Sequence, residues 1–315
     1  MVREQPVALS RFLHLSGWPR ALVSLMSSDV EKDTDINTAV KFRTIKYGQH
    51  GRQTIDVIQP VRSDATEPKA ESLEDLILFV HGGAWGSGFP EIYRLAAVPF
   101  VERGYSVVFL GYRTYPDGTA QDQADDVVAS FQALQAEGLI HTENKVTLMG
   151  HSSGSHISAM ALLSNQQLRE RVNAFVALCG VYDIPRHYIY ERMRGVERFS
   201  PMAVACGVSK DEESTPPPIA LLRKWKYQSP TWLLQSNRIP TSFPDTLIVH
   251  GQNDTTVPVE SPLRFYQALS NAFQSSEGRV ELEVLADVGH ADVITQLMFG
   301  GVARDTVLRW MTETV

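Results

Sequence analysis

Short apolar runs alternate with amphipathic stretches along the chain from residue 41 onward. Several of the runs are apolar throughout, which is typical of strands covered on both faces. The predicted strands are residues 41–47, 54–59, 76–81, 106–113, 145–150, 172–179, 246–250 and 280–285. Strands that alternate with helices predict a parallel sheet with helices on both faces. The first two strands precede any crossover helix, so we expect an antiparallel hairpin at one edge of the sheet.

The stretches between these strands have the periodicity of helices. The longest covers residues 119–137, where Ala124, Val127 and Phe131 lie on one apolar stripe. Acidic residues cluster near its N-terminal end, where carboxylates complement the helix dipole. Further helices are predicted at residues 155–164, 261–273 and 305–312. This pattern predicts a single α/β domain over residues 41–315.

A long insertion interrupts the alternation between Asp183 and Ser242, where a single crossover helix would be enough. Insertions of this length are usually lids or disordered segments. The insertion is rich in proline and also in aromatic residues, among them Trp225 and Trp232. Because the aromatic content argues against disorder, we predict an ordered lid over residues 185–242.

The N-terminal residues 1–40 have a different character from the rest of the chain. Apolar residues occur there near helical spacing, interrupted by Arg3, Arg11 and Arg20. Arginines at these positions break up the apolar core of a secretory signal. We predict an amphipathic helical segment laid over the domain; a transit peptide and a helix on a membrane surface are the alternatives. No apolar run approaches the roughly 20 residues that would cross a bilayer.

Composition and charge narrow the class of partners. The 315 residues are 43% hydrophobic and 21% charged, which excludes a disordered, collagen-like or disulfide-stapled chain. A net charge of −7, with dispersed acids, would repel a phosphate backbone, so no nucleic-acid partner is expected. Cys179 and Cys206 lack metal-ligand or Cys-x-x-Cys spacing and are predicted to be reduced. These features favour the cytoplasm, with an organelle as the alternative if the N-terminal segment is a transit peptide.

The clearest chemical motif is Gly-His-Ser-Ser-Gly at residues 150–154. It follows a predicted strand and opens a helix, which is the context of the Gly-x-Ser-x-Gly nucleophile turn. Side chains two residues before and after the nucleophile would collide, so Gly150 and Gly154 identify Ser152 as the predicted nucleophile. The N–H of Ser153 lies at the helix N-terminus, where an oxyanion would develop.

A serine hydroxyl needs a base, and in this architecture the acid and the histidine follow the serine along the chain. Asp254 follows the predicted strand at 246–250, and His290 follows the one at 280–285. We predict that Asp254 orients His290, and that His290 accepts the proton of Ser152 and returns it to the leaving group.

Three other side chains compete for these two roles. Glu260 and Asp292 are the competing acids, and both are typical of carboxylates at helix starts. His250 is the rival base, but its place at the end of a strand favours a buried, hydrogen-bonded side chain.

A second glycine motif, His-Gly-Gly-Ala-Trp, ends the predicted strand at residues 76–81. Glycines let the backbone approach a substrate and direct its N–H groups into a site. The predicted oxyanion donors are the backbone N–H groups of Gly82, Gly83, Ala84 and Ser153. His81 is predicted to brace the loop, and Trp85 to form a wall of the acyl pocket.

Together these motifs resemble the α/β-hydrolase superfamily over about residues 75–295, and within it the hormone-sensitive-lipase-like esterase branch. The segments that resemble prenylcysteine methylesterases are residues 82–85, 112–119, 150–157 and 199–201. The His-Gly-Gly-x-Trp form is also similar to kynurenine formamidases. Relatives often have Ala at position 153 and Asp at position 111. Gly111 is therefore expected to remove a structural partner of Arg113.

The resemblance implies an α/β-hydrolase fold with a mostly parallel sheet of eight strands and a serine acyl-enzyme mechanism without a metal or an organic cofactor. We expect a carboxylic-ester hydrolase for a small to medium apolar ester, with a prenylcysteine methyl ester as one candidate. An aryl-formamidase that cleaves an N-formyl amide is the first alternative. A hydrolase-fold receptor that binds a small molecule without cleaving it is the second. The oligomeric state is left open.

Overall fold

The computed structural model describes residues 40–60, 73, 75–207, 219–236, 240–273 and 278–315. The predicted N-terminal segment, apart from its last residue, lies outside this part of the chain. Eight strands form one sheet in the order β1-β2-β4-β3-β5-β6-β7-β8. The strands are β1 (Val40–Lys46), β2 (Thr54–Pro60), β3 (Leu76–Val80), β4 (Ser106–Leu110), β5 (Val146–His151), β6 (Ala174–Leu178), β7 (Asp245–Gly251) and β8 (Val280–Leu285).

Most of the sheet is parallel, as predicted. The strands from β4 through β3, β5, β6 and β7 to β8 pair in parallel, whereas β1 pairs antiparallel with β2 and β2 with β4. The predicted edge hairpin of β1 and β2 is confirmed. In the register of the central strands, Val80 lies opposite Gly150, and Gly150 opposite Ala177. The loops that follow these strands therefore lie together at the carboxyl ends of the parallel strands, where α/β proteins bind ligands.

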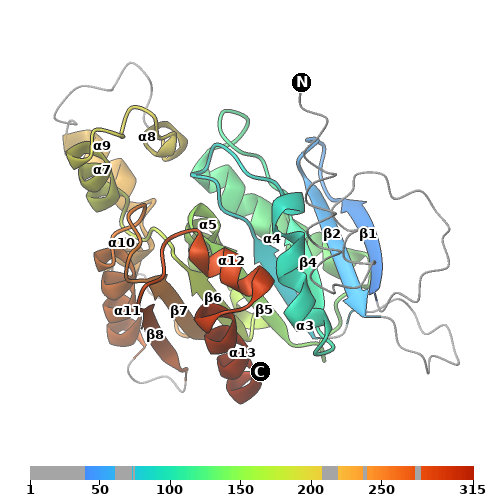
Figure 1. The fold of residues 1–315 in the computed structure, drawn as a ribbon. Helices are drawn as coiled ribbons and strands as arrows, with labels where there is room; N and C mark the ends of the chain where they lie inside the picture. Colours follow the sequence, from blue (N-terminus) through green and yellow to red (C-terminus); the bar gives the residue numbers. More distant parts are fainter. Residues whose placement is uncertain (1–39, 61–72, 74, 208–218, 237–239, 274–277) are drawn as a thin grey trace, which may run out of the picture.

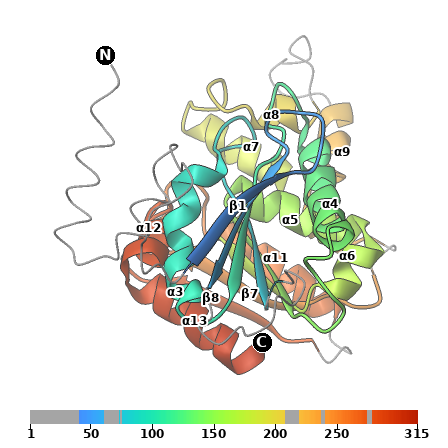
Figure 2. The same ribbon diagram turned by 90° about the vertical axis from the view of Figure 1, so that its right-hand side faces the viewer.

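Helices cover both faces of the sheet (Figures 1 and 2). Alternate residues of β3 enter separate apolar clusters: Leu76, Leu78 and Val80 one, Ile77 and Phe79 the other. The first cluster includes residues of α4 (Ala120–Ala136), α5 (Ser153–Ser164), α6 (Gln166–Arg171) and α11 (Glu260–Ala272). The second includes residues of η1 (Pro90–Ala97), α3 (Val98–Val101), α12 (Asp292–Phe299) and α13 (Val302–Thr314).

The long helix α4 begins with a capping box. The Thr119 side chain accepts the Asp122 N–H, and the Asp122 carboxylate accepts the N–H of Thr119, so two backbone donors at the start of the helix are satisfied. The predicted apolar stripe is buried, including Ala124, Val127 and Phe131. The helix predicted near the C-terminus is longer than expected, since α13 extends over residues 302–314 and α12 precedes it.

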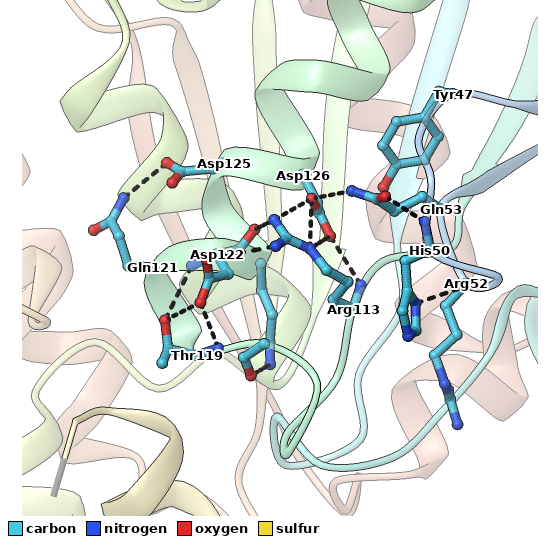
Figure 3. A network of polar contacts seen from close by, with 12 residues as sticks. Tyr47, His50, Arg52, Gln53, Arg113, Thr119, Gln121, Asp122, Asp125 and Asp126 are labelled. Carbon is cyan, nitrogen blue, oxygen red and sulfur yellow. Dashed lines mark hydrogen bonds and ion pairs between the residues drawn. The ribbon is translucent and has the colours of Figure 1, made fainter.

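Arg113, which follows β4, is anchored to α4 (Figure 3). Its Nη2 lies 2.7 Å from Asp126 Oδ1, and its backbone N–H donates to Asp126 Oδ2 at 2.9 Å. Gln53 Nε2 donates to the same carboxylate at 2.8 Å. A Cβ at Gly111 would lie 2.6 Å from the Arg52 carbonyl oxygen. The expectation that Gly111 removes a partner of Arg113 is wrong, because Asp126 supplies that partner and position 111 has no room for a side chain.

The described part of the insertion after β6 is helical. Its helices are α7 (Ile184–Met193), α8 (Met202–Ala205), α9 (Ile219–Lys226) and α10 (Pro230–Leu234). Figure 1 shows α7, α8 and α9 gathered beside one another at one end of the molecule. The ring centroids of Tyr188 and Trp225 lie 4.8 Å apart, and Trp225 is buried. The aromatic residues thus help to order this segment, while its role as a lid stays a prediction.

The two cysteines, Cys179 and Cys206, are both free and buried, in agreement with the predicted reduced state. Burial raises the pKa of both thiols above the ordinary range. Among the residues that the structure describes, no helix has the length and apolar character needed to cross a membrane.

Candidate active site

The predicted nucleophile lies on a strained turn between β5 and α5. Ser152 has φ 55° and ψ −122°, a conformation that residues other than glycine rarely adopt. Its N–H donates to the Leu178 carbonyl oxygen at 2.8 Å, which ties the turn to β6. A Cβ at Gly150 would lie 2.6 Å from the backbone of α5, and one at Gly154 would overlap the Val80 carbonyl oxygen. Both glycines are therefore required for the turn, as the motif predicted.

The structure brings the three residues of the predicted triad together. His290 Nε2 lies 3.0 Å from Ser152 Oγ, and His290 Nδ1 lies 2.7 Å from Asp254 Oδ2. The carboxylate can only accept, so Nδ1 carries the proton and Nε2 is free to accept from the serine hydroxyl. Ser152 and His290 are partly exposed, whereas Asp254 is buried. This arrangement leaves the hydroxyl open to a substrate and keeps the acid away from solvent.

The Asp254 carboxylate is held by backbone as well as by His290. Its Oδ1 accepts the N–H groups of Thr256 and Val257, each at 2.8 Å. Burial raises the pKa of this carboxyl, but the hydrogen bond and positive charge of His290, with the Val257 N–H, outweigh burial and lower it. Asp254 therefore stays ionised at neutral pH and favours a positive charge on the imidazole beside it.

The competing side chains occupy other positions. Glu260 is the exposed first residue of α11, and Asp292 accepts the Gly289 N–H at 2.7 Å as α12 begins. His250 is fully buried; its Nε2 lies 3.0 Å from the Val257 carbonyl oxygen. Burial lowers the pKa of His250, which keeps it neutral. Glu260 and Asp292 thus lie at helix starts, and His250 is buried and hydrogen-bonded, as the sequence predicted.

The predicted oxyanion loop follows β3, and its donors are not equivalent. Gly82 N–H donates to the Tyr93 hydroxyl at 3.2 Å, which argues against the predicted role of this N–H as an oxyanion donor. A Cβ at Gly82 would lie 3.0 Å from Ser152 Cβ, so this glycine lets the loop approach the nucleophile. For the N–H groups of Gly83 and Ala84, the described residues provide no acceptor. These two groups, with Ser153 N–H at the start of α5, are the candidate oxyanion donors.

Trp85 and His81 brace this loop from within the core. Trp85 is 2% exposed, and its indole N–H donates to His156 Nδ1 at 3.0 Å. His156 Nε2 lies 2.7 Å from the Gln228 carbonyl oxygen, so the loop is tied through α5 to the insertion. The Trp85 ring is thus a buried anchor of the loop, and its predicted role as a wall of the acyl pocket stays a prediction. The predicted brace His81 is also buried, and its ring stacks on Tyr112 with centroids 4.2 Å apart.

Two residues that sequence reasoning missed, His151 and Tyr93, connect the parts of the site. His151 Nε2 lies 3.3 Å from the His290 carbonyl oxygen, which can only accept, so Nε2 carries the proton. His151 Nδ1 is then the acceptor for the Tyr93 hydroxyl, 3.3 Å away, and the Tyr93 oxygen accepts the Gly82 N–H. Three hydrogen bonds therefore join the oxyanion loop, the nucleophile turn and the base loop.

Burial and the charge of His290 lower the pKa of His151 to about 3, so its imidazole is neutral under ordinary conditions. A neutral ring adds no positive charge next to the imidazolium that would form on His290. The sequence carries a weak signal for His151, since it adjoins the nucleophile, and none for Tyr93, which is distant along the chain.

Within the part of the chain that the structure describes, two clusters of side chains have the proximity of metal ligands. They are His151, Cys179 and His290, and Cys179, His250 and Asp254. Burial raises the pKa of Cys179, whereas a thiol must lose its proton to bind a metal. Asp254 and His290 are also already hydrogen-bonded to each other. The donor chemistry therefore favours proton transfer over metal binding at these positions.

The sheet order, the strained serine turn and the topological order of the serine, aspartate and histidine loops define an α/β-hydrolase. The chain belongs to the BD-FAE family, whose model matches residues 64–269. The matched stretch contains Ser152 and Asp254, whereas His290 lies beyond it. Esterases and related hydrolases are the relatives and structural neighbours of this chain.

Curated relatives come from two activity groups. The chain is 28% identical over 270 residues to the probable isoprenylcysteine α-carbonyl methylesterase of Arabidopsis thaliana, covering 81% of this chain and 58% of that protein. It is 26% identical over 266 residues to the kynurenine formamidase of Salmo salar, covering 81% of this chain and 76% of that enzyme. The chain thus spans less than two thirds of the length of the methylesterase relative.

Solved structures resemble this chain over nearly its whole length. Esterase B of Lactobacillus rhamnosis, inhibited by a C6-C4 compound, superimposes with a TM-score of 0.64 at 19% identity, covering 99% of this chain and 96% of that one. Esterase 2 of Thermogutta terrifontis, phosphoramylated by tabun, gives a TM-score of 0.59 at 20% identity and covers 87% and 93% of the two chains. At these identities the likeness establishes the fold.

Proposed function

We propose that this chain is a serine carboxylic-ester hydrolase with Ser152 as nucleophile, His290 as general base and acid, and Asp254 as the orienting carboxylate. The observation that carries the proposal is the pair of hydrogen bonds at His290, 3.0 Å to Ser152 Oγ and 2.7 Å to Asp254 Oδ2. It fixes one tautomer of the imidazole and aims its free nitrogen at the hydroxyl, as base catalysis requires.

In the first half of the reaction, Ser152 Oγ attacks the ester carbonyl carbon while its proton moves to His290 Nε2. The negative charge that develops on the carbonyl oxygen is bound by the N–H groups of Gly83, Ala84 and Ser153. The tetrahedral intermediate then collapses. The carbon–oxygen bond to the alcohol breaks, and His290 gives its proton to the departing alkoxide.

In the second half, water attacks the acyl-enzyme. His290 removes a proton from this water, the same donors bind the new oxyanion, and the serine oxygen leaves with the proton from His290. The products are a carboxylic acid and an alcohol, and the free enzyme is restored. The ionised Asp254 stabilises the imidazolium in both halves.

The substrate we propose is a small to medium apolar ester, with a prenylcysteine methyl ester as the leading candidate. Support comes from the isoprenylcysteine methylesterase relative. An aryl-formamidase is the second candidate, because the chain covers 76% of the Salmo salar formamidase against 58% of the methylesterase. The same groups would attack a formyl carbonyl and protonate an aniline nitrogen.

A panel of esters with increasing acyl length, S-farnesylcysteine methyl ester and N-formylkynurenine would separate these candidates. We expect kcat/KM to be highest for an apolar ester, and turnover of each substrate to fall sharply in Ser152→Ala. A preference for N-formylkynurenine by orders of magnitude would select the formamidase instead. A fluorophosphonate probe should label the wild-type chain and not Ser152→Ala; binding of a small molecule without labelling or turnover would select the receptor alternative.

A further inference from the structure

The segment of residues 189–201, here the rim segment, runs along the edge of the candidate active site. At one end, the Tyr190 hydroxyl donates to the Thr255 carbonyl oxygen at 2.7 Å, and the Arg194 guanidinium donates to the same oxygen. Thr255 directly follows the triad acid. At the other end, Pro201 Cγ would lie 2.7 Å from a Cβ at Gly86, which directly follows the oxyanion loop. The rim segment therefore reaches from the acid side of the site to its oxyanion side.

Large apolar side chains of the rim segment point into solvent. Ile189 is 53% exposed, Met193 83% and Phe199 87%. Burial of a phenylalanine or methionine removes an unfavourable contact with water, so side chains this exposed gain nothing from the fold of this chain. Their concentration in one short segment next to a site, rather than as single scattered residues, is typical of an interaction surface.

The charges of the rim segment differ in exposure. Arg192, Arg194 and Arg198 are all exposed, and Arg198 reaches 83%. The two acids of the segment are less exposed, with side chains 12% exposed at Glu191 and 19% at Glu197, and Glu197 Oε1 lies 4.0 Å from Arg198 Nε. The fully exposed charges of the rim segment itself are therefore all cationic, although the whole chain has a net charge of −7. Helix α9 packs against α7 and adds two exposed cations, Arg223 and Lys224.

We propose that the rim segment docks the protein on the surface of an anionic lipid bilayer. Met193 and Phe199 enter the boundary between headgroups and acyl chains, and the arginines bind lipid phosphates. The exposed aromatic and sulfur-containing side chains match the apolar acyl chains of that boundary, and the cations between them match its anionic phosphates. A pocket for a soluble acyl chain needs walls on several sides, whereas Phe199 is almost entirely surrounded by water. Docking in this orientation turns the candidate active site toward molecules held in the membrane.

Binding to vesicles tests this inference without any turnover. The full chain carrying Ser152→Ala is mixed with sucrose-loaded phosphatidylcholine vesicles, with and without phosphatidylserine, and the bound fraction is measured after sedimentation. We expect binding to the anionic vesicles that weakens as salt is added. Met193→Ser/Phe199→Ser and, separately, Arg192→Gln/Arg198→Gln should each lower the partition coefficient about tenfold. Arg194 is left in place because it also holds Thr255.

Matched controls lie on α13, at the other end of the molecule from α7 (Figure 1). Arg304→Gln/Arg309→Gln removes two charges there, and Val302→Ser removes an apolar side chain that is 48% exposed. Both should bind vesicles as the parent does.

Two results would overturn the proposal. The first is a parent chain that fails to sediment with anionic vesicles; if the rim variants then raise KM for a soluble long-chain ester, the segment is a substrate subsite instead. The second is rim variants that bind as well as the parent, which would place the contact elsewhere. Vesicle binding and esterase activity are independent measurements, so failure of either proposal is distinguishable from failure of the other.

Discussion

The candidate site has two halves, one built from side chains and the other from backbone N–H groups. The acid–base half consists of the side chains of Ser152, Asp254 and His290, carried by the loops after β5, β7 and β8. The oxyanion half consists of backbone N–H groups after β3 and at the start of α5. Residue type determines what a side chain can do, whereas an N–H is the same in nearly every residue, and only its surroundings decide whether it is available.

The largest effect is expected from breaking the acid–base half. Ser152→Ala removes the nucleophile, and kcat/KM should fall by about 10⁴-fold or more, to the activity that the oxyanion donors and substrate binding sustain alone. The double variant Ser152→Ala/His290→Ala should be hardly less active than either single variant, because the residues act as one unit. Hydrolysis of a soluble ester measures both. If the two losses multiply, the side chains do not cooperate and the assigned triad is wrong.

Asp254→Asn should cost about 10³- to 10⁴-fold in kcat, since the amide stabilises the wrong tautomer of His290 and carries no charge. The matched control is Asp292→Asn at the start of α12, because the Asp292 carboxylate is bonded to a backbone N–H and not to His290. That variant should retain nearly full activity. A larger loss of kcat in Asp292→Asn than in Asp254→Asn would show that Asp292, and not Asp254, is the carboxylate that orients His290.

Breaking the oxyanion half requires a change in packing rather than in chemistry. Gly82→Ala introduces a Cβ 3.0 Å from Ser152 Cβ and 2.9 Å from the His151 carbonyl oxygen, so the loop must move away from the nucleophile. We expect kcat to fall about a hundredfold, the usual cost of a displacement near 1 Å. Gly51→Ala is the control, because a Cβ there meets nothing within 4 Å. Equal activities of the two variants would show that the loop does not contribute donors.

The difference between the two halves also explains which features of the fold and the site could be predicted from the sequence. The central strands were predictable because buried parallel strands are continuous apolar runs; β6, predicted at 172–179, is Ala174–Leu178. The meeting of Ser152, Asp254 and His290 was predictable because each is a distinctive residue type in a fixed order after a strand. The helix after the nucleophile was predicted from residue 155 and begins at Ser153, directly after the strained turn.

The hydrogen bonds of Gly82 and Trp85 could not be predicted, because they depend on residues from distant parts of the chain. The N–H of Gly82 donates to the hydroxyl of Tyr93 on η1. The indole N–H of the buried Trp85 donates to His156 on α5. Gly111 was misjudged for the same reason, since the partner of Arg113 comes from α4. Pairings of this kind are set by packing between elements, which leaves no regular pattern in the sequence.

The connection between the halves can be weakened by itself. Tyr93→Phe removes the hydroxyl that accepts from Gly82 N–H and donates to His151 Nδ1, which leaves two buried polar groups without a partner. We expect kcat to fall about tenfold with little change in KM. Tyr105→Phe, directly before β4, is the control, and it should leave kcat unchanged. A Tyr93→Phe enzyme with wild-type kcat would mean that the two halves are held independently.

The smallest effect concerns stability toward acid, which both halves share. Burial lowers the pKa of His81 and His156, which brace the oxyanion half, to about 4, and burial together with His290 lowers that of His151 to about 3. The unfolded chain protonates its histidines near pH 6.5, so between about pH 6.5 and 4 it binds more protons than the folded chain. The free energy of unfolding therefore falls as the pH drops through this window, by at most about 1.4 kcal/mol per pH unit for each histidine.

Urea unfolding of wild type and His81→Asn, at neutral pH and near pH 5, tests how much His81 contributes to the pH dependence of the free energy of unfolding. His81→Asn destabilises the fold at both pH values, but it removes one imidazole that must stay neutral. The difference in unfolding free energy between the two pH values should thus be smaller in the variant by up to about 2 kcal/mol. His141→Gln, at an exposed position, should show the wild-type difference. If His81→Asn also shows it, then His81 protonates as readily in the folded chain as in the unfolded one, and burial does not keep this brace neutral.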